Sequence, residues 1–212
     1  MKIIILGGFL GSGKTSVLLQ LARYLVEKEK DMPGEVKVAI IENEVGDVGV
    51  DDKVLVNEGF SVSNLFAGCA CCSLSGELVY SIRNIQNELN PQWLIIEATG
   101  IAHPGSMKQN ILKGFGPPSY ILTVVDAKRW KRLARAMETM VGGQLEDSSK
   151  VLLNKADLVN DAEMEQVKES VHSYNHEVGI IATNAKDTLS VELLKKLVSE
   201  VESLYGNAQA DK

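Results

Sequence analysis

The sequence predicts an α/β protein with a doubly wound, mostly parallel sheet and helices on both faces. Short continuous apolar runs alternate with segments whose apolar residues recur at steps of three and four. Continuous apolar strands separated by amphipathic helices are typical of a parallel sheet that is covered on both sides. A glycine-rich turn also stands between the first apolar run and the first helical segment, which is where open α/β sheets bind their ligands.

Apolar runs are predicted to form the strands, and helical periodicity fills the intervals between them. The predicted strands are Lys2–Leu6, Val36–Ile41, Trp93–Ala98, Tyr120–Ala127, Lys150–Lys155 and Gly179–Thr183. The first helix is predicted over Lys14–Lys30, and a second over Leu74–Leu89. Asn160 and Glu163 have the spacing of a capping box at the start of a later helix. The last helix is predicted to begin after Ser190.

Composition places the chain among ordinary globular proteins. It has 212 residues, of which 45% are hydrophobic and 24% charged, with a formal net charge of −6. This length predicts one domain over residues 1–205 with a flexible tail at 206–212. The negative charge argues against a nucleic-acid partner or an anionic membrane surface. No apolar run is long enough to cross a membrane, so we expect a cytoplasmic protein.

One long connection, at residues 42–73, interrupts the alternation of strands and helices. It is rich in acidic residues and glycine, holds a predicted short strand at Val54–Val56, and contains all the cysteines of the chain. Cys69, Cys71 and Cys72 are too close in sequence to form an unstrained disulfide. They are interpreted either as small buried hydrophobic residues or as a site for metal binding or redox chemistry. A connection of this size in a compact domain is usually functional.

Residues 8–15 read GFLGSGKT and match the phosphate-binding P-loop between a strand and a helix. Its glycines let backbone N–H groups turn towards phosphate oxygens, and the helix N-terminus adds partial positive charge. The lysine is expected to contact the β- and γ-phosphates, and the threonine hydroxyl to bind Mg²⁺. The residues predicted to bind nucleotide here are Gly8, Gly11, Ser12, Gly13, Lys14, Thr15 and Ser16.

The motif NKAD follows the strand predicted at Lys150–Lys155 and indicates that the base is guanine. Asp157 can accept hydrogen bonds from the guanine ring N1–H and the exocyclic amine, which adenine does not offer at that edge. Asn154 and Lys155 complete the motif. Ala185 and Lys186 follow the last predicted strand, where their backbone is expected to contact the guanine oxygen.

An acidic residue ends the apolar strand WLIIE, and a glycine follows three residues later. Glu97 is expected to hold Mg²⁺ through water or to orient the attacking water. The N–H of Gly100 is expected to meet the γ-phosphate of the nucleotide. Together with the two preceding motifs, this predicts a GTP-hydrolysing enzyme.

The chain resembles the metal-handling P-loop GTPases that include CobW, UreG and HypB, and the CobW-like nucleotide-binding domain in particular. The resemblance covers nearly the whole chain and keeps the family's order of motifs. They are GGFLGSGKT (7–15), NEVGDVGVD (43–51), GCACC (68–72), EATGIAHP (97–104), VVDAKRW (124–130) and NKADL (154–158). It implies a GTPase that couples its nucleotide state to delivery of a transition metal or metallocofactor: cobalamin or another corrinoid, nickel or zinc.

The resemblance also implies partners and site residues. GTP or GDP and Mg²⁺ are the expected cofactors, with a nucleotide-dependent homodimer and a client metalloenzyme or corrinoid protein as partners. Hydrolysis is expected to be slow until the protein dimerises or binds its client. Glu44 matches the family motif for nucleotide sensing and Mg²⁺, so the expected catalytic residues are Lys14, Glu44 and Glu97. The Mg²⁺ ligands are expected among Thr15, Glu44 and Glu97, and zinc, cobalt or nickel at Cys69, Cys71 and Cys72.

Two alternatives stay open at this point. One is a redox-sensing nucleotide switch in which the thiols respond to an oxidant. The other is a small-molecule kinase with a structural metal turn, against which the guanine motif speaks.

Overall fold

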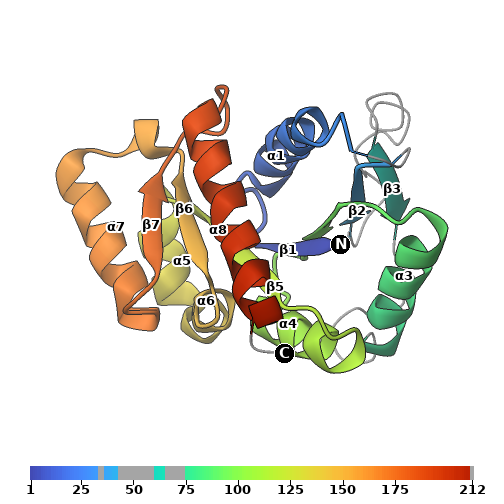
Figure 1. The fold of residues 1–212 in the computed structure, drawn as a ribbon. Helices are drawn as coiled ribbons and strands as arrows, with labels where there is room; N and C mark the ends of the chain where they lie inside the picture. The colour runs from blue at the N-terminus through green and yellow to red at the C-terminus, as the bar shows by residue number, and fades with distance from the viewer. Residues whose placement is uncertain (33–35, 43–59, 65–74, 211–212) are drawn as a thin grey trace.

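A computed structural model describes residues 1–32, 36–42, 60–64 and 75–210, shown in Figure 1. Backbone alone is described for residues 60–64, 75 and 209–210. The predicted strand Val54–Val56, the predicted magnesium ligand Glu44 and the cysteines all lie outside the described residues.

The described strands form one seven-stranded sheet in the order β3-β2-β4-β1-β5-β6-β7. Every neighbouring pair in it is parallel, which confirms the predicted fold class. The strands are β1 Lys2–Gly7, β2 Val38–Glu42, β3 Phe60–Asn64, β4 Trp93–Glu97, β5 Ser119–Asp126, β6 Lys150–Asn154 and β7 Gly179–Ala182. The predicted strands agree with these bounds to within two residues at either end.

Strand β3 lies inside the connection where the sequence analysis placed a strand only at Val54–Val56. It pairs with β2 along its whole length, from the pair Val38 and Phe60 to the pair Glu42 and Asn64. Its sequence, FSVSN, alternates apolar and polar residues, as is usual for a strand that is not buried on both faces. β3 is an edge strand, so the rule of continuous apolar runs did not identify it.

Helices cover both faces of the sheet, as Figure 1 shows. Helices α1 and α8 pack on one face, through the core that contains Leu18, Leu21 and Val198. The other helices pack on the opposite face, where Ile82 of α3 and Ile111 of α4 meet the odd-numbered side chains of β1. The helices are α1 Lys14–Lys28, α3 Ser75–Glu88, α4 Pro104–Gly114, α5 Trp130–Ala136, α6 Glu138–Leu145, α7 Asp161–Tyr174 and α8 Val191–Ala210, with the 3₁₀ turn η1 at Ala156–Leu158.

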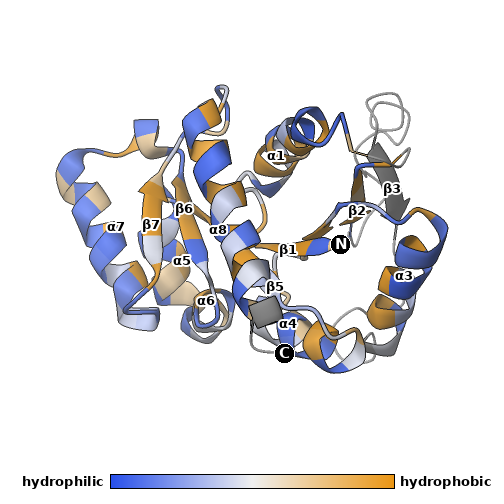
Figure 2. Cartoon of the chain, in the orientation of Figure 1, coloured by the Kyte–Doolittle hydropathy of each residue, from blue (hydrophilic) through white to orange (hydrophobic). Residues whose placement is uncertain are grey.

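Strand hydropathy accounts for this layering. Ile3 and Ile5 belong to the core on one face of the sheet, and Ile4 and Leu6 to the core on the other. Successive side chains of a strand point to opposite faces, so an unbroken apolar strand serves two cores at once. Figure 2 shows the strands as mainly apolar and the helices as apolar on one side only.

The predicted helix ends are largely those found. Asn160 caps α7, and its side chain and that of Glu163 exchange hydrogen bonds with each other's backbone N–H groups, forming the predicted capping box. Helix α8 continues to Ala210, past the point where the sequence analysis ends the domain. Gly206 is tolerated inside it, since glycine costs a helix only about 1 kcal/mol relative to alanine. No helix in the described part of the chain is both long and apolar enough to span a membrane.

Candidate nucleotide-binding site

The predicted motifs converge at the carboxyl ends of the central strands. The loop at residues 8–13 leaves the end of β1, and Glu97 ends β4 in register with Leu6. Asp126 and Asn154 end β5 and β6 as a directly paired set. Because parallel strands all end at the same edge, one sheet edge gathers groups from four strands.

The glycines of residues 8–13 allow a backbone that other residues would strain. Gly8 and Gly13 have φ values of 130° and 100°, and Gly13 occupies the N-cap position of α1. A Cβ atom on Gly8 would overlap the carbonyl oxygen of Val124, and one on Gly13 would overlap the side-chain amide of Asn154. The loop therefore needs glycine at both positions for conformation and for space.

Side chains from the turn between β5 and α5 and from the end of β6 hold the carbonyl groups of this loop. Arg129 Nη2 donates to the Leu10 carbonyl at 2.6 Å, Lys155 Nζ to that of Gly11 at 2.7 Å, and Asn154 Nδ2 to that of Ser12 at 2.7 Å. With three successive carbonyls fixed by side chains, the N–H groups are left as the donors of the loop. This polarity suits a phosphate.

The donors of the loop fit a nucleotide on two further observations. Among the residues that the structure describes, the N–H groups of Gly11 and Gly13 have no hydrogen-bond partner in the protein. The hydroxyl of Ser12 is buried and also has no partner there. Buried polar atoms are normally paired, so the Ser12 hydroxyl indicates a ligand, and the N–H groups of Gly11 and Gly13 are available to donate to a phosphate.

The Lys14 and Thr15 side chains start helix α1 beside the loop. Lys14 is buried, and its ammonium donates to the Gly8 carbonyl at 3.0 Å and the Phe9 carbonyl at 3.4 Å. The Thr15 hydroxyl donates to Glu97 Oε1 at 3.3 Å. A hydroxyl and a carboxylate oxygen are ligands that Mg²⁺ accepts, so two of the three predicted magnesium ligands lie together. Ser16 follows them on the exposed side of the helix.

The base-selecting motif is held by buried amide contacts. Asn154 Oδ1 accepts the backbone N–H of Ala185 at 2.7 Å and thereby ties the NKAD segment to the loop after β7. Gln20 of α1 secures the same loop, donating to the Ala185 carbonyl at 3.0 Å. Asp157 lies exposed in η1, and Lys186 is exposed on the facing loop. The carboxylate of Asp157 is therefore open to a ligand at this edge.

Asp126 organises the cations around the loop. Its side chain is 1% exposed, and Oδ2 accepts from Lys155 Nζ at 2.6 Å and from Arg129 Nε at 2.8 Å. Burial alone would raise the pKa of Asp126, but the hydrogen bonds from Lys155 and Arg129 outweigh it and hold the pKa below its ordinary value. The group is an ionised carboxylate at neutral pH.

Sequence reasoning gave no role to several of these residues. Asp126 and Arg129 lie in the segment VVDAKRW, which was noted only as part of the resemblance. Gln20, which contacts the loop after β7, and Gln144, which contacts the P-loop, are polar residues of helical segments. No spacing in the sequence signals either contact. Gly100 lies with its backbone against the loop at Leu10, and its contact with a γ-phosphate stays a prediction.

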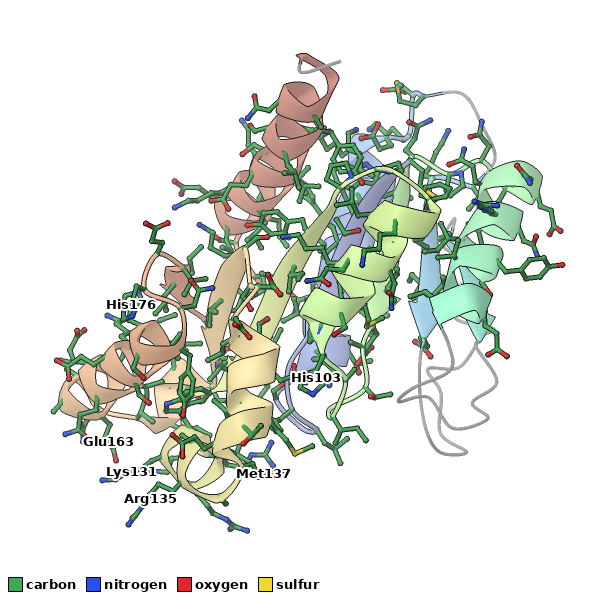
Figure 3. The ribbon with its side chains drawn as sticks, turned by 90° about the horizontal axis from the view of Figure 1, so that it is seen from below. His103, Lys131, Arg135, Met137, Glu163 and His176 are labelled. Carbon is green, nitrogen blue, oxygen red and sulfur yellow. The ribbon has the colours of Figure 1, made fainter. Side chains whose placement is uncertain are left out.

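Among the described residues, no cluster of side chains is arranged to hold a transition metal. No group of three or more His, Cys, Asp or Glu side chains among them is arranged to hold a metal ion. His103 precedes α4 and His176 follows α7, and Figure 3 shows them well apart. Lys131 and Arg135 of α5 point outwards in the same view. The predicted transition-metal site stays a prediction from the sequence.

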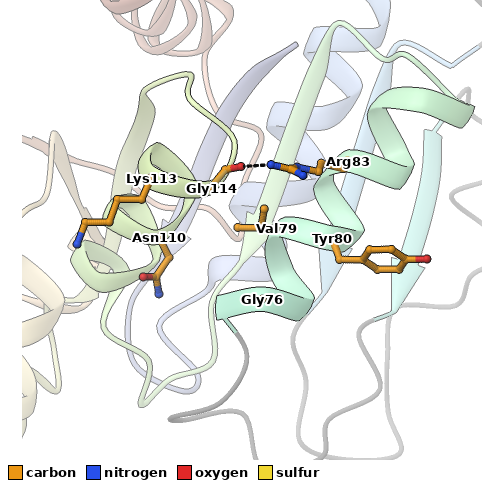
Figure 4. A pocket seen from close by; sticks show the side chains of 7 residues that line it. All are labelled: Gly76, Val79, Tyr80, Arg83, Asn110, Lys113 and Gly114. Atoms are coloured by element: carbon orange, nitrogen blue, oxygen red, sulfur yellow. Dashed lines mark hydrogen bonds between the residues drawn. The ribbon is translucent and has the colours of Figure 1, made fainter.

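A shallow hollow of about 410 Å³ between α3 and α4 lies apart from the phosphate-binding loop. Figure 4 shows Tyr80 and Lys113 at its sides and the hydrogen bond of 2.6 Å from Arg83 to the Gly114 carbonyl. That bond closes the carboxyl end of α4 against α3, so the hollow is a feature of helix packing. None of the predicted site residues lines it.

Comparison with known proteins gives matches over most of the chain. A family model described as "CobW/HypB/UreG, nucleotide-binding domain" matches residues 2–182. The chain is 31% identical over 179 residues to the zinc chaperone YjiA of Escherichia coli K12, covering 77% of this chain and 52% of that protein. It is 25% identical over 242 aligned positions to the zinc-regulated GTPase metalloprotein activator 1 of Dictyostelium discoideum, covering 94% and 48%. The chain thus spans about half the length of these curated relatives.

Solved structures share the fold. HypB from Helicobacter pylori, solved in complex with nickel, superposes with a TM-score of 0.66 at 22% identity, covering 97% of this chain and 89% of that one. HypB from Archaeoglobus fulgidus gives a TM-score of 0.65 at 18% identity, covering 95% and 90%.

Proposed function

The chain belongs to the CobW/HypB/UreG family of nucleotide-binding domains, and on that basis we propose that it binds and hydrolyses GTP and couples its nucleotide state to the handling of a transition metal. The observation that carries this proposal is the convergence of three motifs at one sheet edge. The P-loop, the pair Thr15 and Glu97, and the NKAD segment are joined there by direct hydrogen bonds.

Hydrolysis transfers the γ-phosphoryl group of GTP to water and releases GDP and inorganic phosphate. The N–H groups of the P-loop and the Lys14 ammonium stabilise negative charge on the β- and γ-phosphates. Thr15 and Glu97 would hold Mg²⁺, which neutralises charge on the phosphate oxygens when it is bound. Glu97, or Glu44 from the connection after β2, orients the attacking water.

The base is selected by the exposed carboxylate of Asp157. It accepts two hydrogen bonds from guanine, and a ligand without those donors leaves the carboxylate unpaired. The backbone N–H of Lys186 is proposed to face the guanine oxygen, because that of Ala185 donates to Asn154. Asn154 contacts protein on both sides, so its role is to hold these two loops and the P-loop in one arrangement.

The metal is proposed to bind at Cys69, Cys71 and Cys72 as cargo. Three thiolates form a site for a soft or borderline cation such as Zn²⁺, Co²⁺ or Ni²⁺. The names of the relatives in Escherichia coli and Dictyostelium make zinc the first ion to test. Thiolate ligands persist in a reducing compartment, so the cytoplasm is the proposed location. A metalloenzyme or a corrinoid protein is the proposed client, and the GTP-bound form is proposed to dimerise.

The test is nucleotide binding and phosphate release by the purified protein under reducing conditions. We expect GTP and GDP to bind and ATP to bind far more weakly, with slow Mg²⁺-dependent release of phosphate. Lys14→Ala should abolish the release, whereas Lys195→Ala, on the exposed side of α8, should leave it unchanged. Equal affinity for ATP and GTP would overturn the proposal. Phosphoryl transfer to an added small molecule in place of water would favour a kinase.

A further inference from the structure

The side chain of Gln144 touches two parts of the nucleotide site at once. It lies near the end of α6 and is 3% exposed. Its Oε1 accepts the backbone N–H of Gly8, the first glycine of the P-loop, at 2.7 Å. Its Nε2 donates to the carbonyl of Ala102 at 2.6 Å and is 3.4 Å from that of Gly100. One buried amide thus connects the P-loop to the segment that follows Glu97.

Gln144 is itself held firmly by strand β5. Its backbone carbonyl accepts from the Thr123 hydroxyl at 3.1 Å and from the Ser148 hydroxyl at 3.0 Å. The two hydroxyls are 2.6 Å apart, and both residues are buried. The amide therefore projects from a point of α6 that is bonded to the sheet through Thr123, and it cannot follow either loop without losing a hydrogen bond.

The residues that follow Gly100 also pack against this end of α6. Gly143 has no side chain, and the ring of His103 fills the space where a Cβ would stand. Pro104, the first residue of α4, packs in the same way against Gly7 at the end of β1. Residues 99–104 are thus packed on α6 and β1 as well as bonded to Gln144.

The backbone at Gly100 lies directly on the P-loop. A Cβ atom on Gly100 would stand 2.7 Å from the Leu10 nitrogen, which is closer than real contacts allow. Only a bare glycine backbone fits between the two segments. The position of Gly100 relative to the P-loop is therefore sensitive to loss of the hydrogen bonds that hold its segment, including those from Gln144.

We propose that Gln144 is a positioning residue that ties the segment at residues 99–104 to the first glycine of the P-loop and thereby sets the response to the γ-phosphate. This inference rests on the proposed function, in which the Gly100 N–H meets the γ-phosphate. Gln144 touches no nucleotide; it acts by holding Gly100 at the distance from the P-loop that a γ-phosphate requires. GDP lacks that phosphate, so its binding does not depend on the tie.

Two substitutions distinguish the loss of the hydrogen bonds from Gln144 to Gly8 and Ala102 from a general effect on folding. Gln144→Met keeps the length of the side chain but removes its acceptor and donors. Gln144→Glu keeps an acceptor for the Gly8 N–H, but its ionised form cannot donate to the Ala102 carbonyl. A protonated glutamic acid does have one donor, and burial raises the pKa of a carboxyl group. The Gln144→Glu protein should therefore regain the tie as the pH falls.

The experiment measures the affinities for GDP and for a non-hydrolysable GTP analogue between pH 6 and pH 8. In Gln144→Met we expect the preference for the analogue over GDP to fall about tenfold, the effect of losing a buried hydrogen bond or two, with GDP affinity changed less than about twofold. In Gln144→Glu the preference should approach that of the wild type at pH 6 and fall at pH 8. The wild type at each pH is the reference.

Tyr205→Phe is the matched control. The Tyr205 hydroxyl accepts from the Ile3 N–H at 2.8 Å and donates to the Pro118 carbonyl at 2.5 Å. Both contacts lie at the amino ends of β1 and β5, away from the P-loop. Losing these bonds should lower stability without changing the nucleotide preference. If both Gln144 variants weaken GDP and the analogue equally, or change neither, the inference is wrong while the proposed function stands. If the wild type itself does not bind guanine nucleotides, both fail together.

Discussion

The carboxylate of Asp126 and the ammonium of Lys155 are 2.6 Å apart, at the ends of neighbouring strands. Lys155 also donates to the Gly11 carbonyl, and Arg129, the other cation on Asp126, donates to the Leu10 carbonyl. One buried carboxylate thus positions two cations that each hold the P-loop. Asp126 therefore acts on the site through Lys155 and Arg129.

Replacing Asp126 with asparagine should destabilise the fold by about 2 kcal/mol at neutral pH, the usual loss for hydrogen bonds to charged groups. Lys155 and Arg129 remain partly exposed, so water limits the cost of leaving them unpaired. The folded-state pKa of Asp126 lies below its ordinary value of 3.8, so its contribution is present above that value and is lost as the pH falls through the folded-state pKa. Urea denaturation of both proteins from pH 7 to pH 3 measures this.

The control for this prediction is Asp31→Asn, since Asp31 is exposed and its loss should change the free energy of unfolding by less than about 0.5 kcal/mol. The difference between wild type and Asp126→Asn should be largest near neutral pH and shrink below pH 3.8. A difference that stayed constant down to pH 3 would show that shape, and not the charge of the carboxylate, accounts for the loss.

The strands and the phosphate loop could be predicted because their signals are local. An unbroken apolar run such as that at Lys2–Leu6 has few alternatives in a chain of this composition, and the motif at residues 8–15 needs glycine for space and conformation. The capping box at Asn160 is likewise complete within four residues. In each case the physical cause lies in neighbouring residues, so the sequence displays it.

The side chains that hold the P-loop in place could not be predicted, because the residues they contact are distant in sequence. Gln144 contacts Gly8 across 136 positions, and Arg129 contacts Leu10 across 119. Gln144 is a polar residue in a helical segment and Arg129 a charged residue in a turn, and both residue types are usual at a solvated surface. Strand β3 was missed for a related reason, because its alternation resembles a loop rich in serine unless its pairing with β2 is known.

Gly13→Ala should impair both stability and nucleotide binding. Alanine at a φ of 100° is strained, and its Cβ would overlap the Asn154 amide that holds the Ser12 carbonyl. We expect a loss of about 2 kcal/mol in the free energy of unfolding and weaker binding of GTP and GDP alike. Gly206→Ala, where a Cβ meets nothing within 4 Å, should instead stabilise α8 by up to about 1 kcal/mol. Equal effects of the two substitutions would contradict this account.

Asp157→Asn should change the preferred base without loss of the fold. The carboxylate is exposed and makes no contact that the fold requires, so the free energy of unfolding should change by less than about 0.5 kcal/mol. An amide can donate where the carboxylate only accepted, so GTP should bind more weakly and xanthosine triphosphate more tightly. Competition binding with the two nucleotides measures the exchange. Unchanged affinity for both would remove Asp157 from the base site.

The proposed metal site should respond to the nucleotide. Glu44 and Cys69 lie on either side of β3, in the stretch of chain between β2 and α3. A γ-phosphate and Mg²⁺ that fix the residues around Glu44 should therefore change the arrangement of the thiols through β3. By linkage, GTP must change the affinity for metal by the same factor as metal changes the affinity for GTP, with a typical coupling of about 1–3 kcal/mol. Titration of Zn²⁺ into the protein with GDP and with a non-hydrolysable GTP analogue measures this coupling in one direction.

The thiols give this last prediction a second, independent readout. They must lose their protons to bind, so the affinity for Zn²⁺ should rise as the pH approaches the ordinary thiol pKa of about 8.5, with release of protons on binding. Cys71→Ser should lower the affinity for Zn²⁺ strongly, and should reduce this pH dependence and the difference between the two nucleotide states, while leaving GTP affinity without metal unchanged. Coinciding isotherms in GDP and the analogue would show that the site is not coupled to the nucleotide. Isotherms that Cys71→Ser leaves unaltered would mean that the cysteines serve packing, because a three-thiolate site cannot lose a ligand without losing affinity.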